Sequence, residues 1–238
     1  MLGAMLRRMW VFPLAAAGAV ALAFAGALAR QYLARRRSYQ AIWAAALLMY
    51  AVASFMVFLG ALDGWSAAVF RWYWVLGAVL NVPFLAQGEL DLLVKRRPVR
   101  WALYCLLAFV TAYTIAVVRT ADVSAEALAQ ELPSGKEVFG AGSAAHRLPQ
   151  LISIPAYLVL VGGASWSAWR MRGRPELRDR FWGTLLVALG ATVIAGFGSA
   201  FAALGELVPF ALALLLGIAV MFWGFLRASR DSRAPSGV

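Results

Sequence analysis

The chain has very few of the side chains that hold metals and haem. It contains one histidine, His146, and one cysteine, Cys105, in 238 residues. A bis-histidine haem needs two axial histidines, and zinc sites need a cluster of His or Cys ligands. A lone cysteine also excludes an intrachain disulfide. We therefore expect no metal site and no cofactor, with Cys105 as a small packing residue.

Lysine is scarce as well, and the common catalytic motifs are missing. The two lysines, Lys95 and Lys136, lie between apolar segments, so neither is placed for a retinal Schiff base within a helix. The sequence has no G-x-S-x-G elbow and no phosphate-binding P-loop. We predict no catalytic residue, and a role without enzymatic activity is favoured.

Apolar residues, by contrast, make up 63% of the chain. A soluble domain is closer to about half apolar. Seven apolar segments are each long enough to cross a bilayer, which takes roughly 20 residues. The sequence predicts an all-α integral membrane protein, a seven-transmembrane-helix bundle forming a single domain over residues 1–238. The expected helices are 10–29, 40–61, 71–94, 101–118, 149–169, 181–204 and 207–226.

The positive charge alternates between the two sides of this bundle. Sixteen of the 22 Lys and Arg residues fall in alternate gaps between helices and in the tail 227–238. By the positive-inside rule, the N-terminus lies outside and the C-terminus inside. The net charge of +11 then reflects membrane orientation, so we expect anionic lipid at the inner loops and no nucleic acid. The excess of Arg over Lys is typical of GC-rich bacterial genomes, which suggests a bacterial inner membrane.

The N-terminal segment has a second interpretation. Arg7, Arg8, an apolar run and the sequence Ala27-Leu28-Ala29 resemble a signal peptide with its cleavage site. Cleavage would give every later loop the wrong charge for its side, or would require a different number of helices. The four arginines that follow also oppose translocation, so we expect the first helix to be retained.

The long outer loop, 119–148, is predicted to contain a short helix over Val123–Leu132, ended by Pro133-Ser134-Gly135. The loop is either a tether between two halves or a lid over a binding site. Tryptophans at both ends of the spans are typical of aromatic belts, with Trp10, Trp65 and Trp72 outside and six others inside.

Helices 1–3 and 5–7 share a loose pattern, such as Ile42-Trp43 with Phe181-Trp182 and Ala61-Leu62 with Ala203-Leu204. One interpretation is a three-plus-one-plus-three repeat. Because the linker is a single helix, the two halves would be parallel.

Small residues gather on two helices and let helix backbones approach closely. We expect helix 6 to be central in the bundle, or to form a mobile or homo-oligomeric interface. The small residues on these helices include Ala15, Ala19, Ala23 and Ala27 of helix 1 and Gly183, Gly190, Gly196 and Ser199 of helix 6.

Helix 3 carries the polar residues that best suit a function. Polar groups within a span are costly and usually face the bundle or water. Pro83 removes a backbone donor and frees a carbonyl about one turn earlier. The candidates for a substrate or ion pathway are Asn81, Gln87, Asp91 and Glu89.

These candidates have alternative roles. Asn81 and Gln87 could instead make interhelical hydrogen bonds. Asp91 shares a face with Gln87 and could meet Lys95 or Arg96 at the interface, whereas Glu89 points to another surface.

Asp63 and Glu206 lie in the two short outer loops. They are either turn residues or outer gate candidates. We first predict a small multi-pass transporter or channel with its path between helices 1–3 and 5–7. The alternative is a seven-helix receptor or sensor that binds a partner, and the third is a lipid-modifying membrane enzyme.

Overall fold

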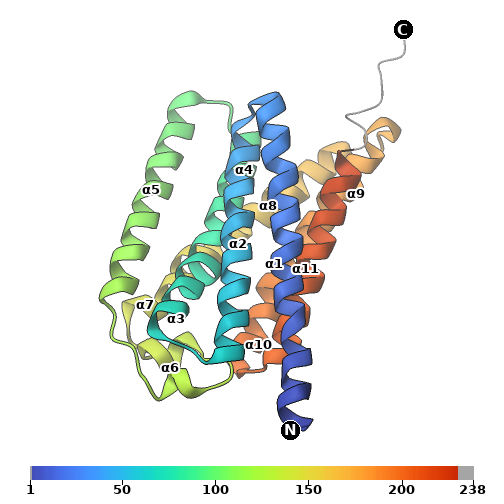
Figure 1. The fold of residues 1–238 in the computed structure, drawn as a ribbon. Coiled ribbons are helices and arrows are strands. Elements are labelled where there is room, and N and C mark those ends of the chain that lie inside the picture. The colour runs from blue at the N-terminus through green and yellow to red at the C-terminus, as the bar shows by residue number, and fades with distance from the viewer. Residues whose placement is uncertain (1, 230–238) are drawn as a thin grey trace.

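A computed structural model describes residues 2–229 of the chain, with side chains from residue 11 onward. The described part contains only helices and loops, and seven helices are long and apolar enough to cross a membrane (Figure 1). The predicted all-α, seven-helix fold is confirmed, and the chain is a multi-pass membrane protein. The side chains of Arg7, Arg8 and Trp10, and the tail from residue 230 onward, lie outside the described residues.

The first four spans fill the first half of the chain. The first two are the single helices α1 (Leu2–Arg35) and α2 (Ser38–Asp63). The third is built from α3 (Ala67–Tyr73), the π-helix η1 (Trp74–Leu80) and α4 (Asn81–Leu93). The fourth is α5 (Arg97–Thr120). The outer loop that follows holds a 3₁₀ turn, η2 (Ala127–Ala129), and a short helix, α6 (Gly135–Phe139).

The last three spans complete the bundle. The fifth joins α7 (Ala144–Leu148), the π-helix η3 (Pro149–Ser153) and α8 (Ile154–Met171). The sixth joins the 3₁₀ turn η4 (Pro175–Leu177), α9 (Arg178–Thr192), the π-helix η5 (Val193–Gly198) and α10 (Ser199–Leu204). The seventh is α11 (Leu207–Ala228). Most spans are longer than the apolar segments predict. Arg and Lys can extend a helix into the headgroup region, because their apolar stems carry the charge out to water.

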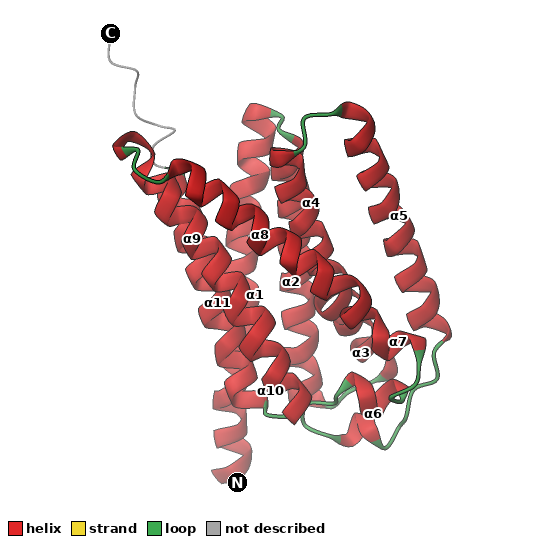
Figure 2. Ribbon diagram, turned by 180° about the vertical axis from the view of Figure 1, so that it is seen from behind, coloured by secondary structure: helices red, strands yellow, loops and turns green. Residues whose placement is uncertain are grey.

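Six of the spans pack in chain order as a ring, and α5 lies outside it (Figures 1 and 2). Two contacts join spans 1–3 to spans 5–7: α4 packs on α8, and α1 packs on α11. We call these the α4–α8 seam and the α1–α11 seam. A parallel repeat would produce this pair of seams. The π-helices, however, fall in spans 3, 5 and 6 and do not correspond between the halves, so the repeat stays a prediction.

The expectation that helix 6 is central is wrong. In its most apolar stretch of 18 residues, only 17% is buried inside the protein, against 50% in the corresponding stretch of α11. The span packs on α8 and on α11, and its closest approach is to α11, where Gly183 and Gly190 lie against the backbone at Gly224 and Gly217. Any Cβ at these positions would collide with a carbonyl oxygen of the other helix. The glycines of α9 therefore serve packing within the chain, and oligomerisation stays a prediction.

Helix α1 shows the same division between a core face and an outer face. Ala19 and Ala23 of the predicted small-residue line are exposed, and Ala17 and Ala21 are fully buried instead. A four-residue repeat in sequence thus identified a small-residue face, but one that points away from the core.

The outer loop differs from its prediction. Residues 123–132 form only the single turn η2, and Ser134 begins helix α6 rather than ending an earlier one. The Ser134 hydroxyl accepts from the amide of Glu137 and donates to its carboxylate at 2.8 Å. This S-x-x-E pattern is a capping box, a helix start that can be read from sequence.

Two buried tryptophans hold this loop against the bundle. The indole N–H of Trp65 donates to the carbonyl of Glu131, and that of Trp74 donates to the carbonyl of Ala145, each at 3.0 Å. Both side chains are 8% exposed. Trp65 therefore anchors the loop and does not belong to a lipid-facing belt, unlike Trp72, which is 58% exposed. The loop is a folded cover on the outer end of the bundle.

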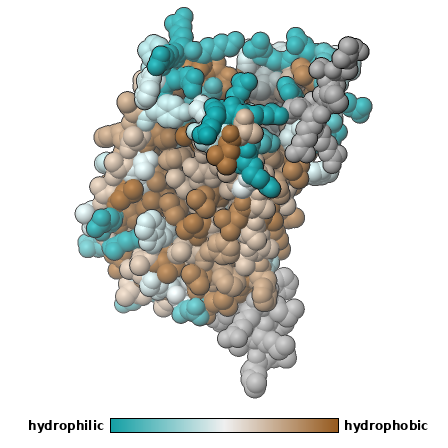
Figure 3. Space-filling view, turned by 45° about the horizontal axis from the view of Figure 1, so that its top comes forward, coloured by the Kyte–Doolittle hydropathy of each residue, from teal (hydrophilic) through white to brown (hydrophobic). Residues whose placement is uncertain are grey.

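The hydrophilic side chains collect at the opposite end, where the α1–α2, α4–α5 and α8–α9 turns lie (Figure 3). These turns carry exposed basic residues that include Arg36, Arg37, Lys95, Arg96 and Arg172. We call this the basic end. The predicted orientation places it in the cytoplasm.

Candidate functional site

The α4–α8 seam begins at a defect in the third span. Pro83 has no N–H for the carbonyl of Val79, and the backbone just before it forms the π-helix η1. The hydroxyl of Ser153, from the π-helix η3 of span 5, contacts the carbonyl oxygens of Ala78 and Val79 at 2.9 and 3.0 Å. The carbonyl group that Pro83 was expected to free is therefore bonded across the seam.

Glu89 lies further along the same seam, one helical turn before the end of α4. The residue is 5% exposed, and its carboxylate accepts a long hydrogen bond of 3.4 Å from the hydroxyl of Ser167 on α8. Gly163 of α8 makes room for it, because a Cβ there would lie 2.6 Å from Cγ of Glu89. Among the described residues, no Lys, Arg or His is within ion-pairing distance of this carboxylate.

Gln87 and Asp91 face the other way, toward α5. The carboxylate of Asp91 accepts from the amide of Gln87 at 3.2 Å and from the hydroxyl of Tyr104 at 2.5 Å. Its basic partner is Arg100, 3.7 Å away, rather than Lys95 or Arg96. The Asp91 side chain is 1% exposed. Gln87 and Asp91 therefore belong to a polar contact between α4 and α5, away from either seam.

Arg100 extends this contact to a third helix. Its guanidinium donates to the hydroxyl of Ser38 at 3.1 Å, at the start of α2. These contacts connect the basic end of α5 to α4 and α2. We call them the α5 bridge; its side chains are Asp91, Tyr104, Arg100 and Ser38.

Asn81 makes the interhelical hydrogen bond that was its alternative role. Its amide donates to the carbonyl of Ala46 on α2 at 2.7 Å, and the residue is 5% exposed. This contact lies within the first half of the ring. Of the four pathway candidates, only Glu89 lies on the seam between the halves.

The gate candidates are at the outer end of the bundle. Asp63 is the last residue of α2, and Glu206 directly precedes α11; both are exposed. Beside Asp63, an open hollow of about 580 Å³ separates the end of α2 from the outer loop. Its wall includes Gly60, Trp65 and Leu128.

Within residues 2–229, no three His, Cys, Asp or Glu side chains gather as a group that could hold a metal ion. Carboxylate, hydroxyl and backbone carbonyl oxygens are the polar atoms of the seam, and they suit a proton or a hard cation.

Sequence reasoning missed the residues that complete these contacts. Ser153, Ser167 and Tyr104 are single polar residues in apolar spans, with no local pattern that marks them. The useful signal for Ser153 was Pro83, since a freed carbonyl in a membrane needs a donor from a neighbouring helix. No protein family model, curated protein or solved structure matches this chain.

Proposed function

We propose that this protein transports a small solute or ion, and that the carboxyl group of Glu89 binds a proton or a cation during transport. The observation that carries the proposal is a buried carboxyl group at the junction of two three-helix halves, without a basic partner among the described residues. A charge in a low-dielectric interior is costly unless it is paired. Ionisable residues inside membranes therefore mark ion or proton pathways by default.

The construction of the seam supports the same function. Both helices that meet there contain a π segment, η1 in span 3 and η3 in span 5. Such segments are frequent at functional sites, and transporters place their binding sites where helices are irregular and repeats meet. The polar contacts of the seam are few, and the one to Glu89 is long. The seam can therefore open at small cost in hydrogen bonding.

The test is aqueous access to the seam. In a Cys105→Ala background, single cysteines are placed by Ser153→Cys and by Ser167→Cys, and membrane-impermeant maleimide is added to either side of oriented vesicles. Alternating access predicts labelling of both positions from both sides. Gln87→Cys is the matched control on the opposite face of α4, which should stay protected.

A second measurement connects access to Glu89. Because proton or cation binding there would bias the seam, labelling of the Ser167→Cys variant should depend on pH. Glu89→Gln should remove that dependence, and Asp91→Asn should leave it. Protection of both seam positions from one side under all conditions would rule the transport proposal out.

The outer hollow favours a second candidate, a receptor that binds a ligand from outside. The hollow lies under a folded loop, and the basic end could receive a partner. A receptor predicts that a Leu128→Cys thiol is labelled from the outer side alone and that the seam positions stay closed. The lipid-modifying enzyme has less support, because Glu89 faces α8 and Asp91 faces α5, so the two carboxylates share no reaction centre.

A further inference from the structure

Helix α5 is the most loosely held span of the described bundle at its basic end. Its inward stripe is fully buried at Thr114 and Val118, near the outer end, where α5 packs on η1 and α7. Toward the basic end the same stripe is only half-buried, at Leu103, Leu107 and Val110. Both ribbon views show α5 standing apart from the ring (Figures 1 and 2).

Polar contacts, rather than apolar packing, connect the basic end of α5 to the other helices. The α5 bridge joins Tyr104 and Arg100 to Asp91 of α4 and Ser38 of α2. Between this bridge and the packed outer end, the inward face of α5 stays partly open and apolar. Water is poorly accommodated beside such a surface at membrane depth, and an apolar side chain left without neighbours forfeits van der Waals contact. A slender apolar chain satisfies both requirements.

The charge beside this half-buried face, at its basic end, determines the headgroup. Lys95 and Arg96 lie in the α4–α5 turn and Arg97 begins α5, and all three are exposed. None of the three side chains makes a hydrogen bond or ion pair with another described residue. The bridge from Arg100 to Ser38 also brings the α1–α2 turn, with exposed Arg36 and Arg37, toward the same end.

Among the described residues, neither carboxylate of α4 is left to neutralise these three side chains. Asp91 is already occupied by Arg100 and Tyr104, and Glu89 is buried against α8. Exposed Trp101 follows one turn into α5, at the level where indole rings prefer the membrane interface. An anionic headgroup above an acyl chain matches every one of these features.

We propose that an anionic phospholipid binds at the α4–α5 turn, with its phosphate held by Lys95, Arg96 and Arg97 and one acyl chain lying along the half-open inward face of α5. The lipid completes the packing of a helix that the protein alone leaves partly unsupported. This site is separate from the seam at Glu89 and does not depend on the transport proposal.

The test compares two lipids and two sets of variants. The detergent-purified protein is mixed with phosphatidylglycerol or phosphatidylcholine, and native mass spectrometry measures the bound lipid. Phosphatidylglycerol should be retained as one molecule per chain and should raise the melting temperature, and phosphatidylcholine should do neither. The triple variant Lys95→Gln, Arg96→Gln, Arg97→Gln should lose both effects. The matched triple Arg172→Gln, Arg174→Gln, Arg178→Gln, in the other long basic turn, should keep them.

A second pair of variants tests the acyl chain. Leu107→Trp fills the inward face of α5 and should weaken phosphatidylglycerol retention, whereas Leu106→Trp, at a position 56% exposed on the outer face, should not. Glycerol phosphate should fail to compete. Equal retention of the two lipids, equal loss in the two triples, or displacement by glycerol phosphate would each overturn the proposal.

Discussion

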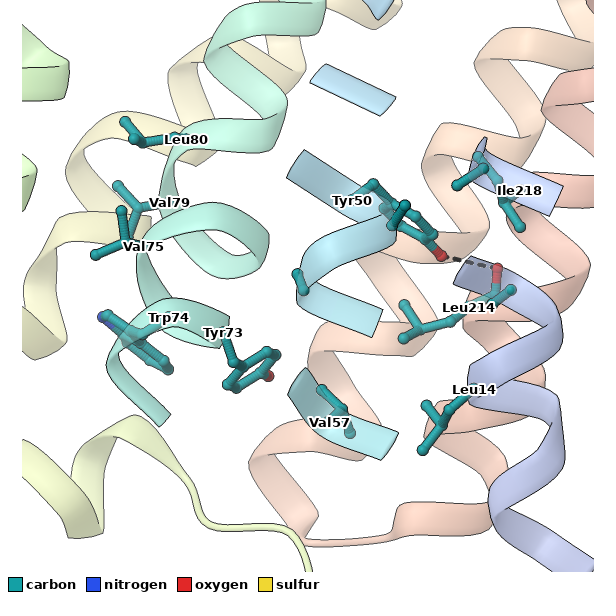
Figure 4. Packing of buried hydrophobic residues seen from close by; sticks show 14 of the residues in the cluster. Leu14, Tyr50, Val57, Tyr73, Trp74, Val75, Val79, Leu80, Leu214 and Ile218 are labelled. Carbon is teal, nitrogen blue, oxygen red and sulfur yellow. Dashed lines mark hydrogen bonds between the residues drawn. The ribbon is translucent and has the colours of Figure 1, made fainter. Parts of the chain in front are cut away.

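The two seams occupy corresponding places in the ring and have opposite chemistry. At the α1–α11 seam, the ring of Phe24 stacks on that of Phe222, with centroids 5.0 Å apart, and lies tilted against that of Phe225, with centroids 4.9 Å apart. One polar contact accompanies these rings, where the hydroxyl of Tyr50 on α2 donates to the carbonyl of Leu214 at 2.8 Å (Figure 4). The α4–α8 seam instead carries Ser153, Ser167 and Glu89.

The apolar seam and the polar seam are suited to different roles. Apolar side chains of one helix can pack against another without any desolvation cost, so the α1–α11 seam is suited to hold the halves together. At the α4–α8 seam a carboxyl group and freed carbonyls need partners, which the opposite span supplies while the seam is closed and water can supply once it opens. We expect the α1–α11 seam to contribute more to the free energy of unfolding than the α4–α8 seam, and the α4–α8 seam to determine activity.

The largest expected effect is at the apolar seam. Phe24→Ala should lower the free energy of unfolding by about 3–5 kcal/mol, because a buried, stacked ring leaves a cavity. Phe12→Ala, in the same helix at a position 64% exposed, should have little effect. Unfolding in detergent, followed by tryptophan fluorescence, measures both. Similar losses for the two variants would contradict the role of the stacked rings.

Overpacking the polar seam should come next. Gly163→Leu places its side chain against Glu89 and Leu93, and such collisions typically cost about 1–3 kcal/mol. Its neighbour Gly162 has no atom within 4 Å of a Cβ, so Gly162→Leu is the matched control. Thermal unfolding of the two variants should differ. If both unfold like the wild type, α8 does not approach α4 as closely as described.

Removing the hydroxyl that spans the polar seam should have a smaller effect. Ser153→Ala leaves the carbonyls of Ala78 and Val79 without this donor, and interhelical hydrogen bonds in membranes are worth about 0.6–1.7 kcal/mol. Ser165→Ala removes an exposed hydroxyl on the same span and should be neutral. If the two variants unfold with the same free energy, the hydrogen bonds of Ser153 do not stabilise the π-helix junction.

The smallest expected effect on stability is in the outer loop, outside both seams. Hydrogen bonds from Ser134 and then Gln130 hold the pKa of Glu137 in the outer loop below its ordinary value. A lowered carboxyl pKa stabilises the fold at pH above the unfolded value, and that contribution is lost as pH falls through the folded pKa. Ser134→Ala should raise the pKa of Glu137, measured by carbon NMR of its carboxyl group. Ser143→Ala, which removes the cap of α7, should leave it unchanged.

The spans were predictable because every helix that crosses a bilayer must be long and apolar, whichever other helices it packs against. The start of α6 was also readable from Ser134 and Glu137, although the loop's Pro and Gly suggested an end instead. Which helix each polar residue meets was not readable. Gln87, Glu89 and Asp91 are within five residues of one another, yet they contact two different helices. Only the packing order of the ring decides this.

The position of α11 in the ring has a consequence for synthesis. The ring partners of Phe24 in α1 lie in the seventh span, about two hundred residues later in the chain, so they are synthesised long after Phe24. Until α11 leaves the ribosome, the inner face of α1 must be occupied by lipid, by a chaperone or by another helix. Ring closure therefore follows the synthesis of α11, and a chain truncated before α11 should be recognised by membrane proteases as unfinished.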